Sequence, residues 1–216
     1  MKVVITGTSQ GIGLATAILF LNRGHEVIGL DIKRSTIDHP NYTHHVCDVV
    51  AQSLMPQVAD ADILVNNAGV QDEVRNLQVN LMGTINATEM YGLQPNIKAI
   101  LNVTSVSAHN GAEFPLYTAS KGGVLAYTKW LAQEVAKYGA TANSLSPGGV
   151  VTPMTKDIWN DPAKKAAVLD ETLLGKWASA QEIAEWIYFI CVVNKSMTAQ
   201  DIIIDNGETA KFNFIQ

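Results

Sequence analysis

The sequence predicts an α/β protein with a doubly wound parallel sheet and helices on both faces of that sheet. Three observations indicate this class. Strand-like and helix-like segments alternate, a glycine-rich turn separates the first strand from the first helix, and polar residues gather just after predicted strands. Alternation favours a parallel sheet, because each crossover helix packs back onto the sheet. We expect a single domain over residues 1–216, since the chain has no repeats and no obvious linker.

Short apolar, often β-branched runs predict the strands. These runs cover residues 2–5, 26–30, 44–46, 61–65, 99–103, 142–145 and 201–204. Helical periodicity covers residues 12–23, 77–93, 118–138 and 180–192, and shorter helical segments follow Pro153. Gly24 and Gly139 stand where two of these helices should end. In such a sheet the ligand crevice lies at the carboxyl ends of the strands, near the switch in strand order.

Composition excludes several classes of function. The chain of 216 residues has a net charge of -5, which gives no electrostatic reason to expect a nucleic-acid partner. Cys47 and Cys191 do not make a disulfide framework, no Cys/His cluster has zinc spacing, and we expect no metal. The apolar run 183–193 is too short to cross a membrane, and the start lacks a signal-peptide pattern. We therefore expect a cytoplasmic protein without a membrane partner.

A glycine-rich turn follows the first strand and opens the first helix. Such a turn lets the backbone approach a phosphate closely, while the helix start presents unpaired N–H groups and the positive end of its dipole. We expect this turn to bind a pyrophosphate, although a purely structural turn is the alternative reading. Its expected binding residues are Gly7, Ser9, Gln10, Gly11, Ile12 and Gly13.

The second strand ends at Asp31, roughly 20 residues beyond the glycines, where a carboxylate accepts hydrogen bonds from ribose hydroxyls. A carboxylate there would repel a 2′-phosphate, so Asp31 favours NAD over NADP. Lys33 and Arg34 oppose that preference, because two cations just downstream would neutralise such a phosphate. A solvated turn carboxylate is the remaining alternative for Asp31.

Several motifs together resemble the short-chain dehydrogenase/reductase family of Rossmann-fold oxidoreductases. Residues 6–13 match its TGxxxGxG spacing, residues 66–69 match NNAG, and residues 117–121 match YxxxK. Ser105 follows the fifth strand, while Pro147, Gly148 and Thr152 follow the sixth. The matches cover residues 2–152, with a weaker tail. The resemblance implies an NAD(P)(H)-dependent enzyme that moves a hydride between cofactor and a small carbonyl or alcohol substrate.

The residues at the expected catalytic end suit that chemistry. Hydride reduction of a carbonyl creates alkoxide character on oxygen, which needs a proton donor and charge stabilisation. Tyr117 is the expected general acid and base, and Ser105 the hydrogen-bond partner of the substrate oxygen. Lys121 lies one helical turn from Tyr117, and its ammonium should lower the pKa of the tyrosine. By resemblance, Lys121 also holds the nicotinamide ribose.

The resemblance carries further residues into the site. Asn80 corresponds to an asparagine that helps hold a water beside the lysine, although an ordinary mid-helix asparagine is the alternative. Asp48 corresponds to an aspartate that contacts adenine. The other residues expected to bind the cofactor by resemblance are Val49, Asn67, Ala68, Gly69, Val150 and Thr152, together with Pro147, Gly148, Tyr117 and Lys121.

The chain departs from the family pattern in several places. The connections between Asp31 and Asp48 and between Gly69 and Asn80 are short, so helices should be truncated there. Residues 205–208 read DNGE, where the family has Asp-Gly-Gly. These changes suggest a trimmed but catalytically equipped member, and leave a catalytically inactive NAD-binding regulator or scaffold as the alternative. Another nucleotide-dependent enzyme is a third possibility.

Residues 152–180 should cover the substrate. Its apolar side chains would cap a pocket or simply pack amphipathically; the candidates are Met154, Ile158, Trp159 and Leu169. His109 and Glu113 are candidates for the pocket border. The substrate is left open between 3-oxoacyl thioesters, sugars or polyols, and small ketones. By resemblance we expect a homodimer or homotetramer that assembles through the helices at 77–93 and 118–138.

Overall fold

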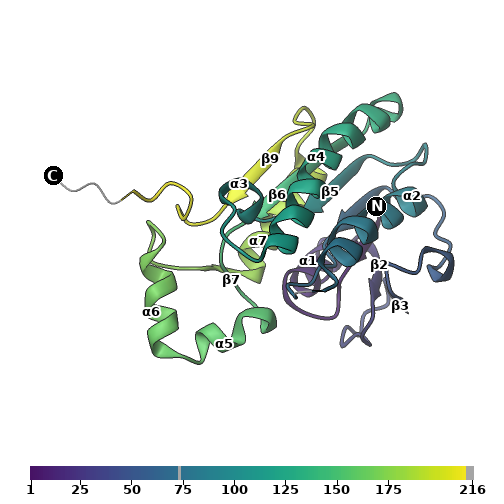
Figure 1. Ribbon diagram of the computed structural model, residues 1–216. Coiled ribbons are helices and arrows are strands. Elements are labelled where there is room, and N and C mark those ends of the chain that lie inside the picture. Colours follow the sequence, from purple (N-terminus) through teal and green to yellow (C-terminus); the bar gives the residue numbers. More distant parts are fainter. Residues whose placement is uncertain (73, 213–216) are drawn as a thin grey trace.

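A seven-stranded parallel sheet forms the centre of the computed structural model, which describes residues 1–72 and 74–212 (Figure 1). Glu73 and residues 213–216, which belong to the expected domain 1–216, lie outside the described residues. The strand order is β3-β2-β1-β4-β5-β6-β9, so it reverses between β1 and β4. The predicted doubly wound class is confirmed. The strands are β1 (Lys2–Thr6), β2 (Glu26–Asp31), β3 (Tyr42–Val46), β4 (Ile63–Asn66), β5 (Ala99–Val103), β6 (Thr141–Pro147) and β9 (Asp201–Ile204).

The central strands are buried on both faces, which explains their nearly continuous apolar runs. Successive side chains of a strand point to opposite faces, so Val3 and Ile5 pack into one core cluster and Val4 into the other. Helices α1 (Gly11–Asn22) and α7 (Ala180–Tyr188) cover the first face. Helices α2 (Gly83–Tyr91) and α4 (Pro115–Val135) cover the second.

The shorter elements lie mainly at the carboxyl edge of the sheet. There, α5 and α6 stand out from the sheet on the long connection between β6 and α7 (Figure 1). The pair β7–β8 forms a separate two-stranded sheet at the base of this connection. The elements are α3 (Ser107–Asn110), α5 (Lys156–Trp159), α6 (Pro162–Asp170), β7 (Val150–Val151) and β8 (Ala178–Ser179), with 3-10 turns η1 (Gln52–Leu54), η3 (Ala136–Tyr138) and η4 (Pro153–Thr155).

Two predicted helices are not uniform α-helices. The segment 77–93 starts with a π-helical segment, η2 (Leu77–Met82), before α2, and the segment 180–192 ends in a second one, η5 (Phe189–Val193). A π-helix widens the turn by one residue and is frequent at functional sites. Apolar periodicity does not distinguish the two geometries, because one extra residue shifts the pattern only locally.

The connection between β2 and β3 is truncated, as expected. Residues 32–41, all of them described, contain no helix, and Ile37 and Tyr42 pack against the core on that side. Within the described residues, no helix is both long enough and apolar enough to cross a membrane.

Candidate active site

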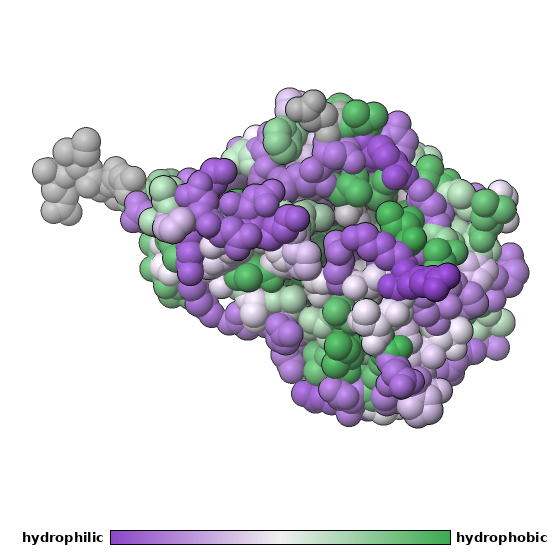
Figure 2. Space-filling model, turned by 90° about the horizontal axis from the view of Figure 1, so that it is seen from below, coloured by the Kyte–Doolittle hydropathy of each residue, from purple (hydrophilic) through white to green (hydrophobic). Residues whose placement is uncertain are grey.

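A cavity of about 1040 Å³ opens at the carboxyl edge of the sheet, where the strand order reverses. The segments that follow β1, β2, β3, β4, β5 and β6 all contribute to its lining. This is the place expected for a ligand in a doubly wound sheet. On the face turned toward the viewer in Figure 2, hydrophilic and hydrophobic residues are interspersed.

The glycine turn is shaped by close backbone contacts. Gly7 has φ +76° and Gly11 has φ +57°, backbone angles that residues other than glycine rarely adopt. A Cβ at Gly13 would lie 2.0 Å from the carbonyl oxygen of Gly7, so only glycine fits between helix and strand. The side-chain amide of Asn67 donates to the carbonyl oxygens of Thr6 at 3.0 Å and Gly7 at 3.2 Å. These hydrogen bonds fix the start of the turn to the segment after β4.

The start of α1 suits an anion. In the described part of the chain, no side chain caps its first turn, and Gln10, Gly11 and Ile12 line the cavity. Uncapped N–H groups at a helix start, beside glycines that let a ligand come close, fit a pyrophosphate. The residues present therefore match the dinucleotide that the sequence predicts.

Asp31 lies at the cavity with both carboxylate oxygens engaged. Its Oδ2 accepts the backbone N–H of Ser9 at 2.9 Å, and its Oδ1 accepts that of Lys33 at 2.9 Å. The Lys33 ammonium, which also lines the cavity, donates to Oε1 of Gln10 at 3.0 Å. The two opposing signals for cofactor choice thus lie side by side, with the carboxylate fixed in position by backbone donors.

Asp48 lies beside a cation that the sequence did not indicate. Its Oδ2 accepts from a guanidinium N–H of Arg75 at 2.8 Å, and its Oδ1 accepts the backbone N–H of Val50 at 3.0 Å. Asp48 and Arg75 both line the cavity, together with Val49 and Ala68. The pair contributes to the cavity wall on the β3 side.

Three residues meet at the other end of the cavity. Tyr117 and Lys121 extend from α4, whose first turn begins with Pro115, and Ser105 follows β5. Tyr117 and Ser105 are hydrogen-bonded through their side chains. The Lys121 Nζ lies 5.7 Å from the centre of the Tyr117 ring and donates to the Val103 carbonyl oxygen at 2.9 Å.

Burial dominates the electrostatics of this trio. Burial raises the pKa of Tyr117, the hydrogen bond with Ser105 lowers it, and the Glu113 carboxylate raises it again. Burial also lowers the pKa of Lys121 from 10.5 to about 8. The expectation that Lys121 would give Tyr117 a lowered pKa is wrong for this structure, since desolvation of the phenolate outweighs the stabilising contacts.

Asn80 is buried in the π-helical segment η2 and does not itself line the cavity. Its Oδ1 accepts the Val70 N–H at 2.8 Å, and its Nδ2 donates to the Val70 carbonyl oxygen at 2.9 Å and to the Ser120 hydroxyl at 3.0 Å. It ties the segment after β4 to α4, next to Lys121.

Most residues predicted for the site line this one cavity, whereas Ser9, Gly13 and Asn80 are not part of its lining. Ser9 contacts the lining residue Asp31 through its backbone N–H, and Gly13 packs against the lining residue Gly7. The residues in the lining are Gly7, Gln10, Gly11, Ile12, Asp31, Asp48, Val49, Asn67, Ala68, Gly69, Ser105, Tyr117, Lys121, Pro147, Gly148, Val150 and Thr152.

The segment 152–180 contributes differently from what the sequence suggested. Met154 and Ile158 line the cavity, but Trp159 and Leu169 do not. Trp159 instead packs edge-on against Trp177 with ring centres 5.8 Å apart and lies under the Lys165 ammonium. Trp159 therefore has a packing role, because its ring supports Trp177, which lines the cavity.

Sequence reasoning missed a second group of lining residues. The most informative are Gln71, Phe114, Trp177 and Glu208. The unusual DNGE ending drew attention to Glu208 without suggesting a place for it. Glu113 does line the cavity. His109 does not, and its Nε2 lies 2.8 Å from Oδ2 of Asp201.

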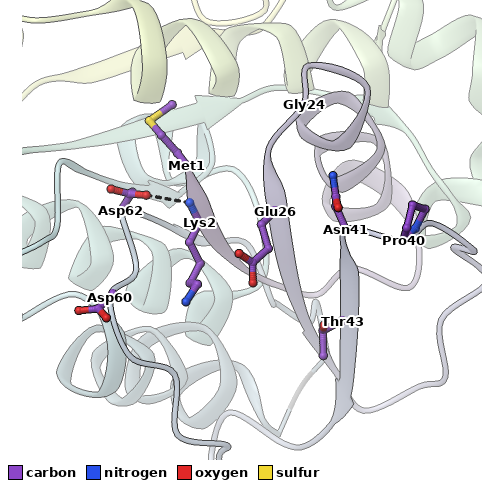
Figure 3. A pocket seen from close by; sticks show the side chains of 9 residues that line it. All are labelled: Met1, Lys2, Gly24, Glu26, Pro40, Asn41, Thr43, Asp60 and Asp62. Carbon is purple, nitrogen blue, oxygen red and sulfur yellow. Dashed lines mark hydrogen bonds between the residues drawn. The ribbon is translucent and has the colours of Figure 1, made fainter.

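A smaller cavity of about 530 Å³ lies at the opposite edge of the sheet, around the amino ends of β1 and β2 (Figure 3). Its lining includes Met1, Glu26 and Asp62, and the Lys2 backbone N–H donates to Asp62 at 2.8 Å. Neither the glycine turn nor Tyr117 reaches it. Among the described residues, no group of three or more His, Cys, Asp or Glu side chains could hold a metal ion.

Comparison with known proteins agrees with this architecture. Over residues 7–209 the chain matches the family described as enoyl-(acyl carrier protein) reductase. A 3-oxoacyl-(acyl-carrier-protein) reductase of Thermotoga maritima is 32% identical across 94% of this chain and 96% of its own length. A short chain dehydrogenase family protein from Francisella tularensis has a TM-score of 0.86 at 29% identity, covering 97% of this chain and 99% of that chain. A mutant 4-hydroxyisoleucine dehydrogenase complexed with NADH and succinate has a TM-score of 0.87 at 27% identity, covering 99% of this chain and 100% of that chain.

Sheet, glycine turn and cavity together define a Rossmann-fold oxidoreductase that uses a nicotinamide dinucleotide. The chain belongs to the short-chain dehydrogenase/reductase family. It is an NAD(P)-dependent enzyme that acts on CH–OH or C=O groups.

Proposed function

We propose that this enzyme transfers a hydride between NAD(H) and a small carbonyl or secondary alcohol substrate, with Tyr117 as the general acid and base. One observation carries the proposal: Tyr117, Ser105 and Lys121 line the same cavity as the glycine turn and Asp31. A ligand that rests its pyrophosphate on the turn can therefore reach the phenol. A bound nicotinamide supplies the hydride in reduction and accepts it in oxidation.

The side chains of this trio divide the remaining work. In reduction, Ser105 donates a hydrogen bond to the substrate oxygen, and Tyr117 gives its proton to that oxygen as the C–H bond forms. The phenolate left behind takes a proton from solvent, and oxidation runs through the same steps in reverse. With a pKa of about 8, Lys121 is mostly an ammonium at neutral pH and stabilises the phenolate as it forms.

Asn80 is proposed as a positioning residue. Its amide holds both backbone groups of Val70 and the hydroxyl of Ser120, the residue before Lys121. These contacts keep Lys121 in register with the segment after β4. A water held beside the lysine, as the resemblance implies, would add proton relay to this role.

We propose NAD as the preferred cofactor. The carboxylate of Asp31 is fixed at the cavity wall by two backbone donors, where it would repel a 2′-phosphate. Lys33, whose ammonium already donates to Gln10, offsets that repulsion in part.

The test of this function is Tyr117→Phe, which removes only the hydroxyl. We expect turnover on a panel of ketones and alcohols to fall by about 10²- to 10⁴-fold, because the proton donor is lost. NADH binding, followed by nicotinamide fluorescence, should stay within about twofold. Tyr138→Phe, in the 3-10 turn η3 that follows α4, is the matched control and should keep full activity. Retained activity in Tyr117→Phe would show that Tyr117 is not the general acid and base. Cofactor binding without any turnover in the unmodified protein would favour the alternative of an NAD-binding regulator.

We further propose a homodimer or homotetramer assembled through α4 and the segment 77–93. Leu77, Met82, Leu116 and Trp130 leave large apolar side chains exposed on these elements. Such a surface favours burial against a second copy. Light scattering at micromolar concentration should give a mass of two or four chains, and a monomer would contradict the proposal.

A further inference from the structure

Besides Asp31, Asp48 and Asp72, the lining of the cavity that holds Ser105 and Tyr117 contains four more carboxylates. Four acidic residues from separate segments of the chain contribute to this lining. They are Glu113 before α4, Asp157 in α5, Glu171 after α6 and Glu208 after β9. We call these four residues the acidic end of the cavity.

Cations are absent from the acidic end as far as the described lining goes. The basic residues of the whole lining are Lys33, Arg75 and Lys121. Lys33 and Arg75 lie on the β2–β3 side, where Lys33 donates to Gln10 and Arg75 pairs with Asp48. Lys121 is buried behind the phenol against the Val103 carbonyl. The residues outside the description are Glu73 and 213–216, and none of them is Lys or Arg.

Three of these carboxylates, those of Glu113, Glu171 and Glu208, interact electrostatically. Burial raises the pKa of Glu208, a hydrogen bond from Gly149 lowers it, and Asp205, Glu171 and Glu113 raise it further. Glu113 also acts on the pKa of the reacting hydroxyl of Tyr117. Glu113, Glu171 and Glu208 therefore lie near enough for their charges to interact, and the charge of Glu113 also reaches the Tyr117 hydroxyl.

Glu113 is the member best placed to contact a substrate. Its Oε2 accepts from the side-chain amide of Gln71 at 2.6 Å. Burial raises the pKa of Glu113 and this hydrogen bond lowers it, and no cation in the described lining pairs with its carboxylate. Phe114 and Trp177 line the same region, and aromatic ring faces attract cations. A metal ion does not explain the carboxylates, because the described His, Cys, Asp and Glu side chains form no group that could hold one.

Resting on the proposed function, we propose that the substrate is a secondary alcohol or ketone that carries a positively charged amine, and that Glu113 selects it. The ammonium would lie between Glu113 and the aromatic rings while the oxygen meets Ser105 and Tyr117. In reduction the ketone takes the hydride from NADH and the proton from Tyr117, giving the amino alcohol and NAD⁺; the amine is unchanged. Carboxylate or phosphate substrates would meet like charge and be disfavoured.

The first experiment compares three small ketones that differ in charge: aminoacetone, hydroxyacetone and pyruvate. With NADH and NADPH in parallel, kcat/KM should be highest for aminoacetone and lowest for pyruvate. In Glu113→Gln the preference for aminoacetone over hydroxyacetone should fall about 10- to 100-fold, mainly through KM, because a charged hydrogen-bond partner is lost. Glu134→Gln, on the exposed side of α4, makes the same charge change away from the cavity and should leave the preference intact.

A second experiment measures binding without turnover. The three ketones are titrated calorimetrically into Tyr117→Phe, with and without NADH, and the series is repeated in Tyr117→Phe combined with Glu113→Gln. Only aminoacetone binding should weaken on loss of Glu113. Glu171→Gln provides a second variant if the first one does not fold, as judged by circular dichroism.

The outcomes separate the two proposals. Equal or better turnover or binding of hydroxyacetone or pyruvate would overturn the amine proposal and leave the dehydrogenase function standing. Failure of NADH and NADPH to bind, or of the enzyme to reduce any ketone, would overturn the dehydrogenase function. Selective aminoacetone binding that depends on Glu113 would still support the acidic end as an amine site.

Discussion

Individual residues at the two ends of the cavity have clear physical reasons for their identity. Gly7 and Gly11 adopt positive φ, which is a local property, so the turn can be predicted from sequence. Asp31 ends a strand at the expected distance from that turn, and Tyr117 and Lys121 are one helical turn apart. Their pKa values could not be predicted in the same way, because desolvation depends on everything packed around them.

Asp31 supports a prediction about cofactor choice. In Asp31→Asn the negative charge that opposes a 2′-phosphate is lost, while one side-chain acceptor remains for Ser9 or Lys33. We expect the ratio of the NADPH and NADH dissociation constants to fall by about tenfold, equivalent to about 1.4 kcal/mol. Fluorescence titration of both cofactors measures the ratio. Asp38→Asn, in the exposed loop after β2, is the charge-matched control; an unchanged ratio in Asp31→Asn would show that this carboxylate does not select the cofactor.

Among the elements, strands were the easiest to predict, since a short apolar, β-branched run bounded by turn residues is a local pattern. The segment Asp201–Ile204 was predicted with its observed bounds. The π-helical segment at Leu77–Met82 was not predicted, because its apolar positions also fit an α-helix. This segment carries Asn80, whose amide contacts depend on Val70 and Ser120 from two other parts of the fold.

The packing of α1 on β1 gives a prediction at this scale. In Gly13→Ala the new Cβ would collide with the backbone oxygen of Gly7, 2.0 Å away, so the helix must shift from the strand. We expect the melting temperature to fall by several degrees and NADH affinity to drop at least about tenfold, as overpacking costs about 1–3 kcal/mol.

Gly122→Ala is the matched control for that substitution. A Cβ at Gly122 meets open space on α4, so alanine should stabilise the helix by about 0.5–1 kcal/mol. Thermal unfolding of both variants, with and without NADH, provides the comparison. Equal melting temperatures in Gly13→Ala and the unmodified protein would show that the turn is not closely packed.

For the whole molecule, burying an ammonium has a cost that depends on pH. Burial lowers the pKa of Lys121 from 10.5 to about 8. Below about 8 the folded protein carries a buried charge; between about 8 and 10.5 the folded state loses this proton before the unfolded state does. The unfolded state then binds more protons, so the Lys121 contribution to the free energy of unfolding rises with pH through this window, by up to about 3 kcal/mol.

Lys121→Met isolates this contribution, because it removes the charge and keeps an unbranched chain. We expect the stability of the unmodified protein relative to Lys121→Met to rise by about 3 kcal/mol between pH 7.5 and 10.5. Urea unfolding across this range measures the difference. Lys129→Met, an exposed lysine on α4, should show a difference that does not change with pH. A pH-independent difference for Lys121→Met as well would mean that the ammonium is not desolvated.

The sequence alone determined the α/β class and the glycine turn at the first strand and helix, because periodicity and turn chemistry are properties of neighbouring residues. The trio Ser105, Tyr117 and Lys121 became candidates through the resemblance to the family. Only the tertiary structure decided that Glu113, Asp157, Glu171 and Glu208 line the same cavity, and that burial raises the pKa of Tyr117. Both results depend on segments that lie far apart in the chain. No local sequence pattern shows that these segments come together or that they exclude water from the groups between them.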